Sequence, residues 1–125
     1  WIYEYRALTD TPSFQLLPTG VGGVLYPPNS IRSEAFNKEA IFATSLYCDD
    51  LWLKINAVMN NVKTVVPNEN CRIIFLEGTQ DVALAKMNAL SGNIDLALKK
   101  ILDYLDTDNK ESKLILEKMR KDRFA

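Results

Sequence analysis

The residues best suited to do chemistry in this sequence are two adjacent aspartates, Asp49 and Asp50. A carboxylate beside a substrate hydroxyl can take its proton while that oxygen attacks an electrophile, which is general base catalysis. Two adjacent carboxylates repel each other, and this repulsion raises the pKa of one of them, which suits a base. The competing interpretation is structural, because aspartate is common at helix N-termini, where it accepts hydrogen bonds from free amide groups.

A glycine-containing segment precedes the aspartates and runs from Gly20 through Gly22 and Gly23 to Tyr26, where two prolines follow. Gly22 and Gly23 have no side chains, so a ligand or another backbone can approach closely and bond to their amides. A plain turn or bulge is the alternative for both glycines. The Tyr26 hydroxyl likewise has two interpretations: it points either into a cleft or toward a buried hydrogen-bond partner. The segment therefore predicts a strand edge beside a cleft.

Composition excludes several classes of protein. There is no histidine, and the two cysteines, Cys48 and Cys71, have no second pair, which excludes the usual zinc frameworks and a Cys-His catalytic pair. A net charge of −1 without a long run of either sign argues against nucleic acid as a partner. No apolar stretch approaches the ~20 residues needed to span a bilayer. We therefore expect a soluble cytoplasmic chain with reduced cysteines.

The elements that must position these residues follow from hydrophobic spacing. We predict short strands over residues 14–17, 24–26, 63–67 and 71–76, and helices over residues 33–44, 49–60, 81–90, 94–105 and 110–124. The aspartates then lie at the mouth of the second helix. The fold class predicted for residues 1–125 is α/β, or α+β within this one domain, with a few short strands and about five helices packed around them.

Three segments, in this order and spacing, carry a resemblance to a known family: PTGVGGVLYPP at 18–28, FNKE at 36–39 and CDDLWLK at 48–54. Together they resemble the C-terminal signature of bacterial glycosyltransferases of the GT-A type. Gly78-Thr79-Gln80, Asn88 and the GNID segment at 92–95 extend the similarity over about residues 15 to 105. Cys48 departs from the family pattern, which has alanine there.

The resemblance implies transfer of a sugar from a nucleotide-sugar donor to a saccharide or lipid-linked acceptor, in surface polysaccharide biosynthesis at the inner face of the cytoplasmic membrane. It implies a divalent metal, Mn or Mg, for the complete enzyme, held by an upstream Asp-x-Asp. Asp106-Thr107-Asp108 matches the Asp-x-Asp pattern but lies at the end of a predicted amphipathic helix, so we assign no metal residue to this chain. We expect residues 1–125 to be the acceptor-side part, with the donor-binding part absent and no transfer by this part alone.

The same resemblance gives roles to individual residues. Asp50 matches the catalytic base, and Asp49 holds the acceptor by hydrogen bonds. Trp52 offers an aromatic face to a sugar ring, or instead fills the core. The remaining substrate-binding candidates are those of the glycine segment, Gly22, Gly23 and Tyr26.

Two other functions compete with sugar transfer. One is a non-catalytic binding or protein-interaction domain, in which the glycine segment shapes a groove. The other is a hydrolase that uses Asp49, Asp50 and Glu39. A truncated transferase should expose apolar surface along residues 14–26, and we expect self-association through that surface.

Overall fold

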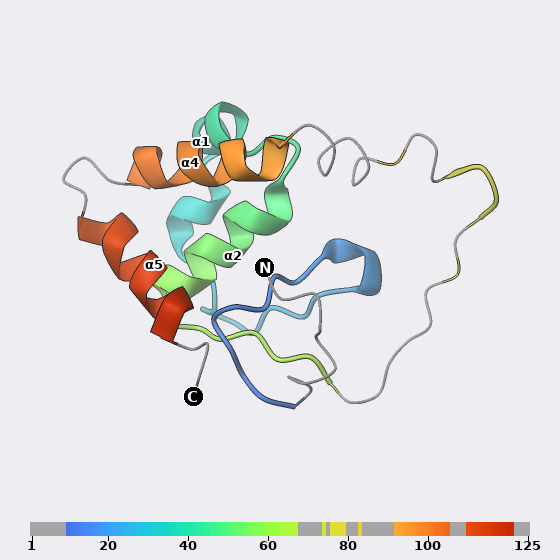
Figure 1. Cartoon of the computed structure of the whole chain (residues 1–125), viewed down its shortest axis with the longest axis horizontal. Helices are drawn as coiled ribbons and strands as arrows, with labels where there is room; N and C mark the ends of the chain where they lie inside the picture. Colours follow the sequence, from blue (N-terminus) through green and yellow to red (C-terminus); the bar gives the residue numbers. More distant parts are fainter. Residues whose placement is uncertain are drawn as a thin grey trace.

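The computed structural model describes residues 10–67, 74, 76–79, 83, 92–105 and 110–121. This part of the chain is mostly helical (Figure 1). Two short 3-10 helices, η2 (Gly20–Gly22) and η3 (Ser33–Phe36), precede the first α-helix. The α-helices are α1 (Lys38–Thr44), α2 (Asp49–Met59), α4 (Asn93–Leu105) and α5 (Lys110–Lys121).

The predicted α/β fold class is wrong for the described residues, which form no sheet. Their extended segments meet at an isolated antiparallel bridge, in which the amides of Ser13 and Thr64 donate to each other's carbonyls at 2.8 and 3.0 Å. The predicted strands at 14–17 and 24–26 are not strands. Short apolar runs suit a buried loop as well as a strand. Phe14 packs against the helices instead of pairing, and Leu16 is buried.

The predicted helix at 33–44 is divided at Asn37 into η3 and α1. The Asn37 side chain accepts a hydrogen bond from the Ala40 amide at 3.1 Å and so caps the N-terminus of α1. The helices at 49–60 and 94–105 are confirmed to within one residue, and α5 confirms the helix that starts at Lys110. Nearly all of the predicted helix at 81–90 and most of the predicted strand at 71–76 lie outside the described residues.

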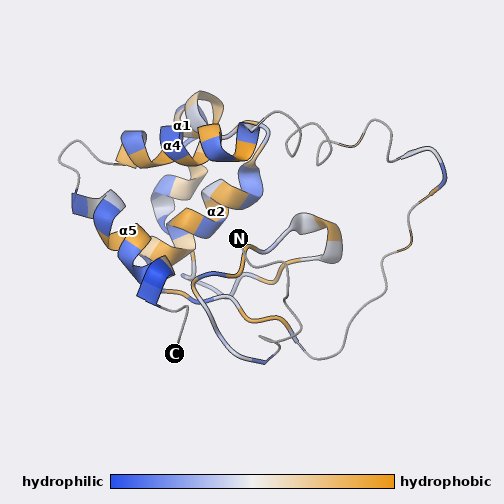
Figure 2. Ribbon diagram, in the orientation of Figure 1, coloured by the Kyte–Doolittle hydropathy of each residue, from blue (hydrophilic) through white to orange (hydrophobic). Residues whose placement is uncertain are grey.

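Helix α2 is the centre of the described part of the chain: η3, α4 and α5 pack on it, and α1 packs on α4 (Figure 1). Its predicted apolar stripe is buried: Leu51, Ile55 and Val58 are at most 2% exposed. The apolar sides of α4 and α5 turn toward α2, and their hydrophilic residues face outward (Figure 2). The described core is completed by residues from all four helices and the 14–17 segment, chiefly Phe14, Ala40, Trp52, Ala97, Ile101 and Ile115.

A buried lysine ties α2 to the segment that follows it. Lys54 is 1% exposed, and its Nζ donates to Thr64 Oγ1 at 2.9 Å. This contact joins the middle of α2 to the bridge residue Thr64, on the side of the helix that faces residues 10–17. None of the described helices combines the length and the apolar character that crossing a bilayer requires.

Candidate functional site

The two aspartates occupy the first turn of α2, as the sequence predicts. The N-cap residue is Cys48, and its side chain makes no capping hydrogen bond. The Asp50 carboxylate does not bond to an amide of its own helix. Its Oδ1 instead accepts a hydrogen bond from the backbone amide of Gly20 at 3.1 Å, across 30 residues of sequence. Asp50 therefore joins the glycine segment to the start of α2, and the simple capping interpretation does not describe it.

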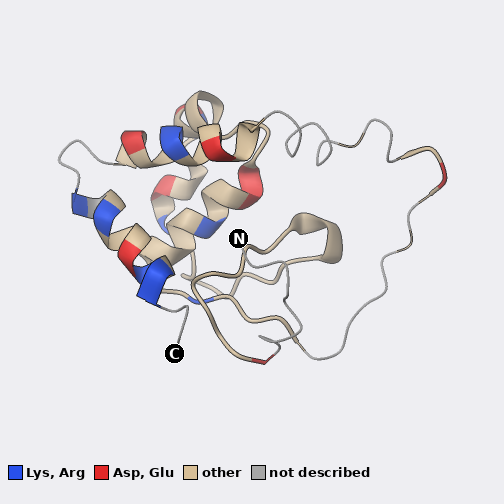
Figure 3. Ribbon diagram, viewed as in Figure 1, with Lys and Arg blue, Asp and Glu red and all other residues tan. Residues whose placement is uncertain are grey.

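No positive charge neutralises the acid pair from the glycine segment. Residues 11–31 carry no charged side chain, and Figure 3 shows the acidic start of α2 beside this uncharged loop. The pKa of Asp50 is raised above its ordinary value, first by burial and second by the negative charge of Asp49, while the hydrogen bond from the Gly20 amide opposes the shift. A raised pKa brings the carboxyl closer to the range of a general base.

Tyr26 reaches the same place from the other end of the glycine segment. Its hydroxyl oxygen is buried, and it has no hydrogen-bond partner among the described residues. Burial raises the pKa of this phenol, and the charges of Asp50 and Asp49 raise it further, so the hydroxyl keeps its proton. A buried polar group without a partner is costly, by about 1–3 kcal/mol. The structure thus places an unused donor within the electrostatic reach of two carboxylates.

The two predicted substrate-binding glycines are exposed on the loop. Gly22 ends η2, and the amide of Gly23 donates to the Gly20 carbonyl at 3.0 Å. Gly23 has φ of 83°, in the region that favours glycine, and no described atom lies within 4 Å of the position of an added Cβ. The turn itself therefore requires this glycine, whatever else the open surface does.

Trp52 belongs to the core, which is the second of the two roles expected for it. The residue is 1% exposed, and its Nε1 donates to the Ala35 carbonyl at 2.9 Å. Its ring meets that of Tyr104 in an edge-to-face arrangement, with centroids 6.0 Å apart. The indole therefore presents no open face to a sugar ring and instead fastens η3 to α2.

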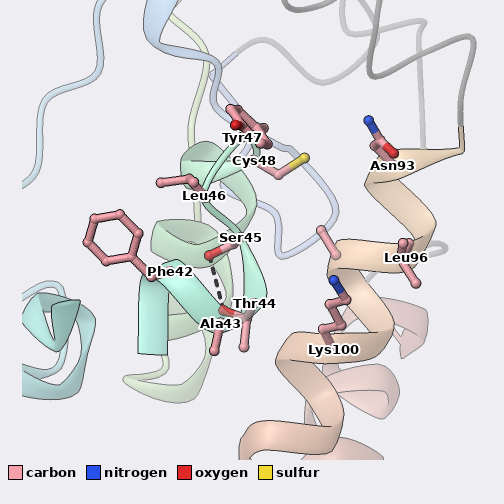
Figure 4. Close-up of a pocket in the computed structure, with 11 residues that line it drawn as sticks. Phe42, Ala43, Thr44, Ser45, Leu46, Tyr47, Cys48, Asn93, Leu96 and Lys100 are labelled. Carbon is pink, nitrogen blue, oxygen red and sulfur yellow. Dashed lines mark hydrogen bonds between the residues drawn. The ribbon is translucent and has the colours of Figure 1, made fainter. Parts of the chain in front are cut away.

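Two features were not predicted. The burial of Lys54 has only a faint signal in the sequence, namely its position one helical turn after Asp50 and between core residues. The second feature is a hollow between the end of α1 and the first two turns of α4 (Figure 4). Its signal in the sequence is faint: apolar residues on both sides of Thr44-Ser45, namely Phe42, Ala43, Leu46 and Tyr47, continue past the end of α1.

Metal ligation gains no support from the part of the chain that the structure describes, since no three His, Cys, Asp or Glu residues gather there. The Asp106-Thr107-Asp108 segment lies outside the described residues, as does Cys71. Cys48 is a free thiol at the start of α2. Burial raises its pKa, and the charges of Asp49 and Asp50 raise it further, so the thiol form dominates.

Comparison of the chain with protein-family models, with curated proteins and with solved structures finds no match in any of the three.

Proposed function

We propose that this chain contributes the acceptor-side site of a sugar transferase, with Asp50 as the base that takes the proton of the acceptor hydroxyl. The observation that supports this proposal best is the hydrogen bond from the Gly20 amide to Asp50 Oδ1. It fixes the carboxylate by one oxygen, and the Asp50 side chain makes no other hydrogen bond within the described residues. The second oxygen is therefore available to a hydroxyl.

In the proposed reaction, the acceptor oxygen attacks the anomeric carbon of a nucleotide-sugar donor. A new carbon–oxygen bond forms, the bond to the diphosphate breaks with its electron pair on the leaving group, and the proton passes to Asp50. The described residues do not offer the ligand set of a divalent metal, so no step is assigned to one. The resemblance of the glycine segment and the acid pair supports a setting in surface polysaccharide synthesis on the cytoplasmic side of the membrane.

Asp49 and Tyr26 have supporting roles in this proposal. Asp49 is exposed beside Asp50, where it can accept a hydrogen bond from a second hydroxyl of the acceptor. Its charge also helps to raise the pKa of Asp50. Tyr26 stays protonated and can donate to an acceptor oxygen once that oxygen replaces its missing partner. Gly22 and Gly23 leave the loop surface open for the acceptor.

The test combines transfer and binding. We would read the complete open reading frame around these residues, express it, and measure nucleoside diphosphate release from a panel of nucleotide-sugars with saccharide acceptors. Asp50→Asn should reduce transfer by at least about 10²-fold, because the proton then has no acceptor. Asp49→Asn should reduce it less. The acid limb of the pH–rate profile should lie above the ordinary range of a carboxyl, since the pKa of Asp50 is raised.

Saccharide binding to the chain of residues 1–125 provides the second measurement, by saturation-transfer NMR with methyl glycosides. Binding that is weakened by Tyr26→Phe would support an acceptor site. Full transfer activity of Asp50→Asn would contradict the proposal. So would the absence of saccharide binding both by the product of the complete reading frame and by the chain of residues 1–125.

A non-catalytic binding domain is the second candidate, and the exposure of the glycine segment favours it. Val21 is 68% exposed and Leu25 is 91% exposed, on a loop whose backbone conformation is fixed by Asp50 and Gly23. Exposed apolar side chains on a fixed loop suit contact with another protein. Retention of partner binding by Asp50→Asn together with its loss in Leu25→Ser would favour this candidate over transfer.

A further inference from the structure

A hollow of about 310 Å³ opens beside the acid pair, and the proposed reaction does not use it. One wall is the C-terminal end of α1 with the turn that leads to Cys48, and the other is the first two turns of α4 (Figure 4). The α1 and α4 helices pack directly on each other below it, so both walls are held by the core. Volumes of this size are typical of sites for small molecules.

The rim of this hollow is apolar and exposed. Tyr47 and Leu96 are 62% and 52% exposed, and the buried Ala97 lies between α4 and the turn. Phe42 and Leu46 also belong to the lining, but their side chains point away from α4 (Figure 4). Single exposed apolar side chains are ordinary on a protein surface, but several around one hollow indicate a place where an apolar group is bound.

The lining of the hollow also includes a cation and a weakly bonded hydroxyl. Among the described residues of the lining, Lys100 is the one that is charged, and none is aspartate or glutamate. Figure 4 shows the Lys100 side chain extending along α4, across the gap from the turn that carries Ser45. An anion in the hollow would therefore meet a positive charge at close range and no negative side chain in the walls.

Ser45 is 2% exposed, yet its hydroxyl is poorly bonded. Thr44 Oγ1 donates its proton to the Ala40 carbonyl at 2.7 Å, so Ser45 must supply the proton in the 3.2 Å contact between the two hydroxyls. That distance is long for an O–H···O hydrogen bond, which is ordinarily about 2.5–3.0 Å. The Ser45 proton can therefore turn to a ligand anion at little cost.

We propose that this hollow binds a small amphiphilic anion, namely an apolar chain or ring that ends in a single phosphate or carboxylate. The anionic head lies between Lys100 and Ser45, and the apolar part lies against Leu96, Ala97 and Tyr47. The head group belongs at the Lys100 end because the charges of Asp49 and Asp50 act on the opposite end, at Cys48. The inference does not rest on sugar transfer.

Cys48 provides a built-in reporter, because its thiol lines the hollow and is partly exposed. The rate at which iodoacetamide alkylates Cys48 would be followed by peptide mass spectrometry, which separates its peptide from that of Cys71. The probes are octyl phosphate, inorganic phosphate and the neutral octyl glucoside, each below its micelle concentration. Octyl phosphate should slow alkylation saturably, and at concentrations at least about tenfold lower than the other two.

Two lysine variants separate the charge in the hollow from charge in general. Lys100→Met should weaken the protection by octyl phosphate about tenfold, because a hydrogen-bonded charge is removed from the head group. Lys99→Met removes the neighbouring lysine of α4, which does not line the hollow, and should leave protection unchanged. Leu96→Ser should weaken the protection of Cys48 by octyl phosphate and by octyl glucoside to the same extent.

Three results would overturn the proposal. Equal protection by inorganic phosphate would mean a simple anion site, and equal protection by octyl glucoside would mean an uncharged apolar hollow. Absence of saturable protection by octyl phosphate would mean that the hollow binds no such ligand.

Discussion

At the scale of single residues, the Asp50 carboxylate combines a structural bond with an unfavourable charge. Its Oδ1 holds the Gly20 amide, while burial and Asp49 raise its pKa. The folded chain therefore binds a proton at Asp50 more tightly than the unfolded chain does. The free energy of unfolding falls as pH rises from about 4, the ordinary carboxyl pKa, through the raised pKa of Asp50. A group that costs stability near neutral pH is expected where a site serves function.

Replacement of Asp50 by asparagine tests this balance. Asn Oδ1 can still accept from the Gly20 amide, but it carries no charge. We expect the melting temperature of Asp50→Asn relative to the wild type to increase between pH 4 and pH 7. The corresponding gain in the free energy of unfolding should stay below about 1 kcal/mol, because solvent screens a partly exposed group.

Glu39→Gln is the matched control for this experiment, because it removes an exposed carboxylate from the first turn of α1. Asp49→Asn should flatten the pH dependence only in part, since burial remains the larger cause of the Asp50 shift. If Asp50→Asn were less stable than the wild type at neutral pH, the carboxylate would be mainly an anchor for the loop.

Gly23 tests the conformation of the loop that Asp50 holds. Its φ of 83° strains any residue with a Cβ, so Gly23→Ala should destabilise the fold by about 1–2 kcal/mol. Gly20→Ala is the control: its Cβ would lie 3.6 Å from Asp50 Oδ1, an ordinary contact, and no left-handed φ is needed. We expect the control to change stability by less than about 0.5 kcal/mol in urea unfolding. Similar losses in both variants would contradict the described turn.

At the scale of elements, the docking of α5 depends on one deeply buried side chain. Ile115 is 1% exposed and belongs to the core around α2, whereas its neighbour Leu116 is 47% exposed. A further contact ties α5 to the N-terminal segment, where Gln15 Nε2 donates to the Met119 carbonyl at 2.7 Å. The helix thus stabilises both α2 and the segment that leads into the glycine loop.

Truncation of these two neighbours distinguishes burial from helix propensity. Ile115→Ala should lower the free energy of unfolding by about 2–5 kcal/mol, because it leaves a cavity against α2. Leu116→Ala should change it by less than about 0.5 kcal/mol. Denaturant midpoints measured under the same conditions give both values, and equal effects would mean that α5 docks by a different face.

At the scale of the whole molecule, the exposed apolar surface is narrower than the expected span of residues 14–26. Phe14 and Leu16 are 8% and 5% exposed, because they pack into the core. Val21 and Leu25 carry the exposure instead, on the glycine loop. Any association through this region should therefore depend on the loop and not on the segment before it.

Sedimentation equilibrium over a range of protein concentrations tests this expectation. The weight-average mass should rise with concentration for the wild type and less for Leu25→Ser, which removes the most exposed apolar side chain of the loop. Thr19→Ser, an exposed change beside the loop, is the control. A monomer at all concentrations would instead favour the self-standing binding domain.

The sequence by itself determined the helices α2, α4 and α5 and the position of Asp49 and Asp50 at a helix start. These features depend on the spacing of residues within one segment, such as the stripe of Leu51, Ile55 and Val58, which a helix of 3.6 residues per turn places on one face. The break at Asn37 is also local, although only the observed hydrogen bond from the Ala40 amide to the Asn37 side chain reveals it.

Only the tertiary structure decided which distant partner each remaining segment takes. The short apolar run that contains Phe14 and Leu16 suits a strand or a buried loop equally well, and packing on the helices selected the loop. Other features likewise depend on residues far apart in the chain. They are the hydrogen bond between Asp50 and Gly20, the burial of Trp52 and Lys54, and the hollow between α1 and α4. Local spacing carries no information about such contacts, because they form only when the packed helices bring those residues together.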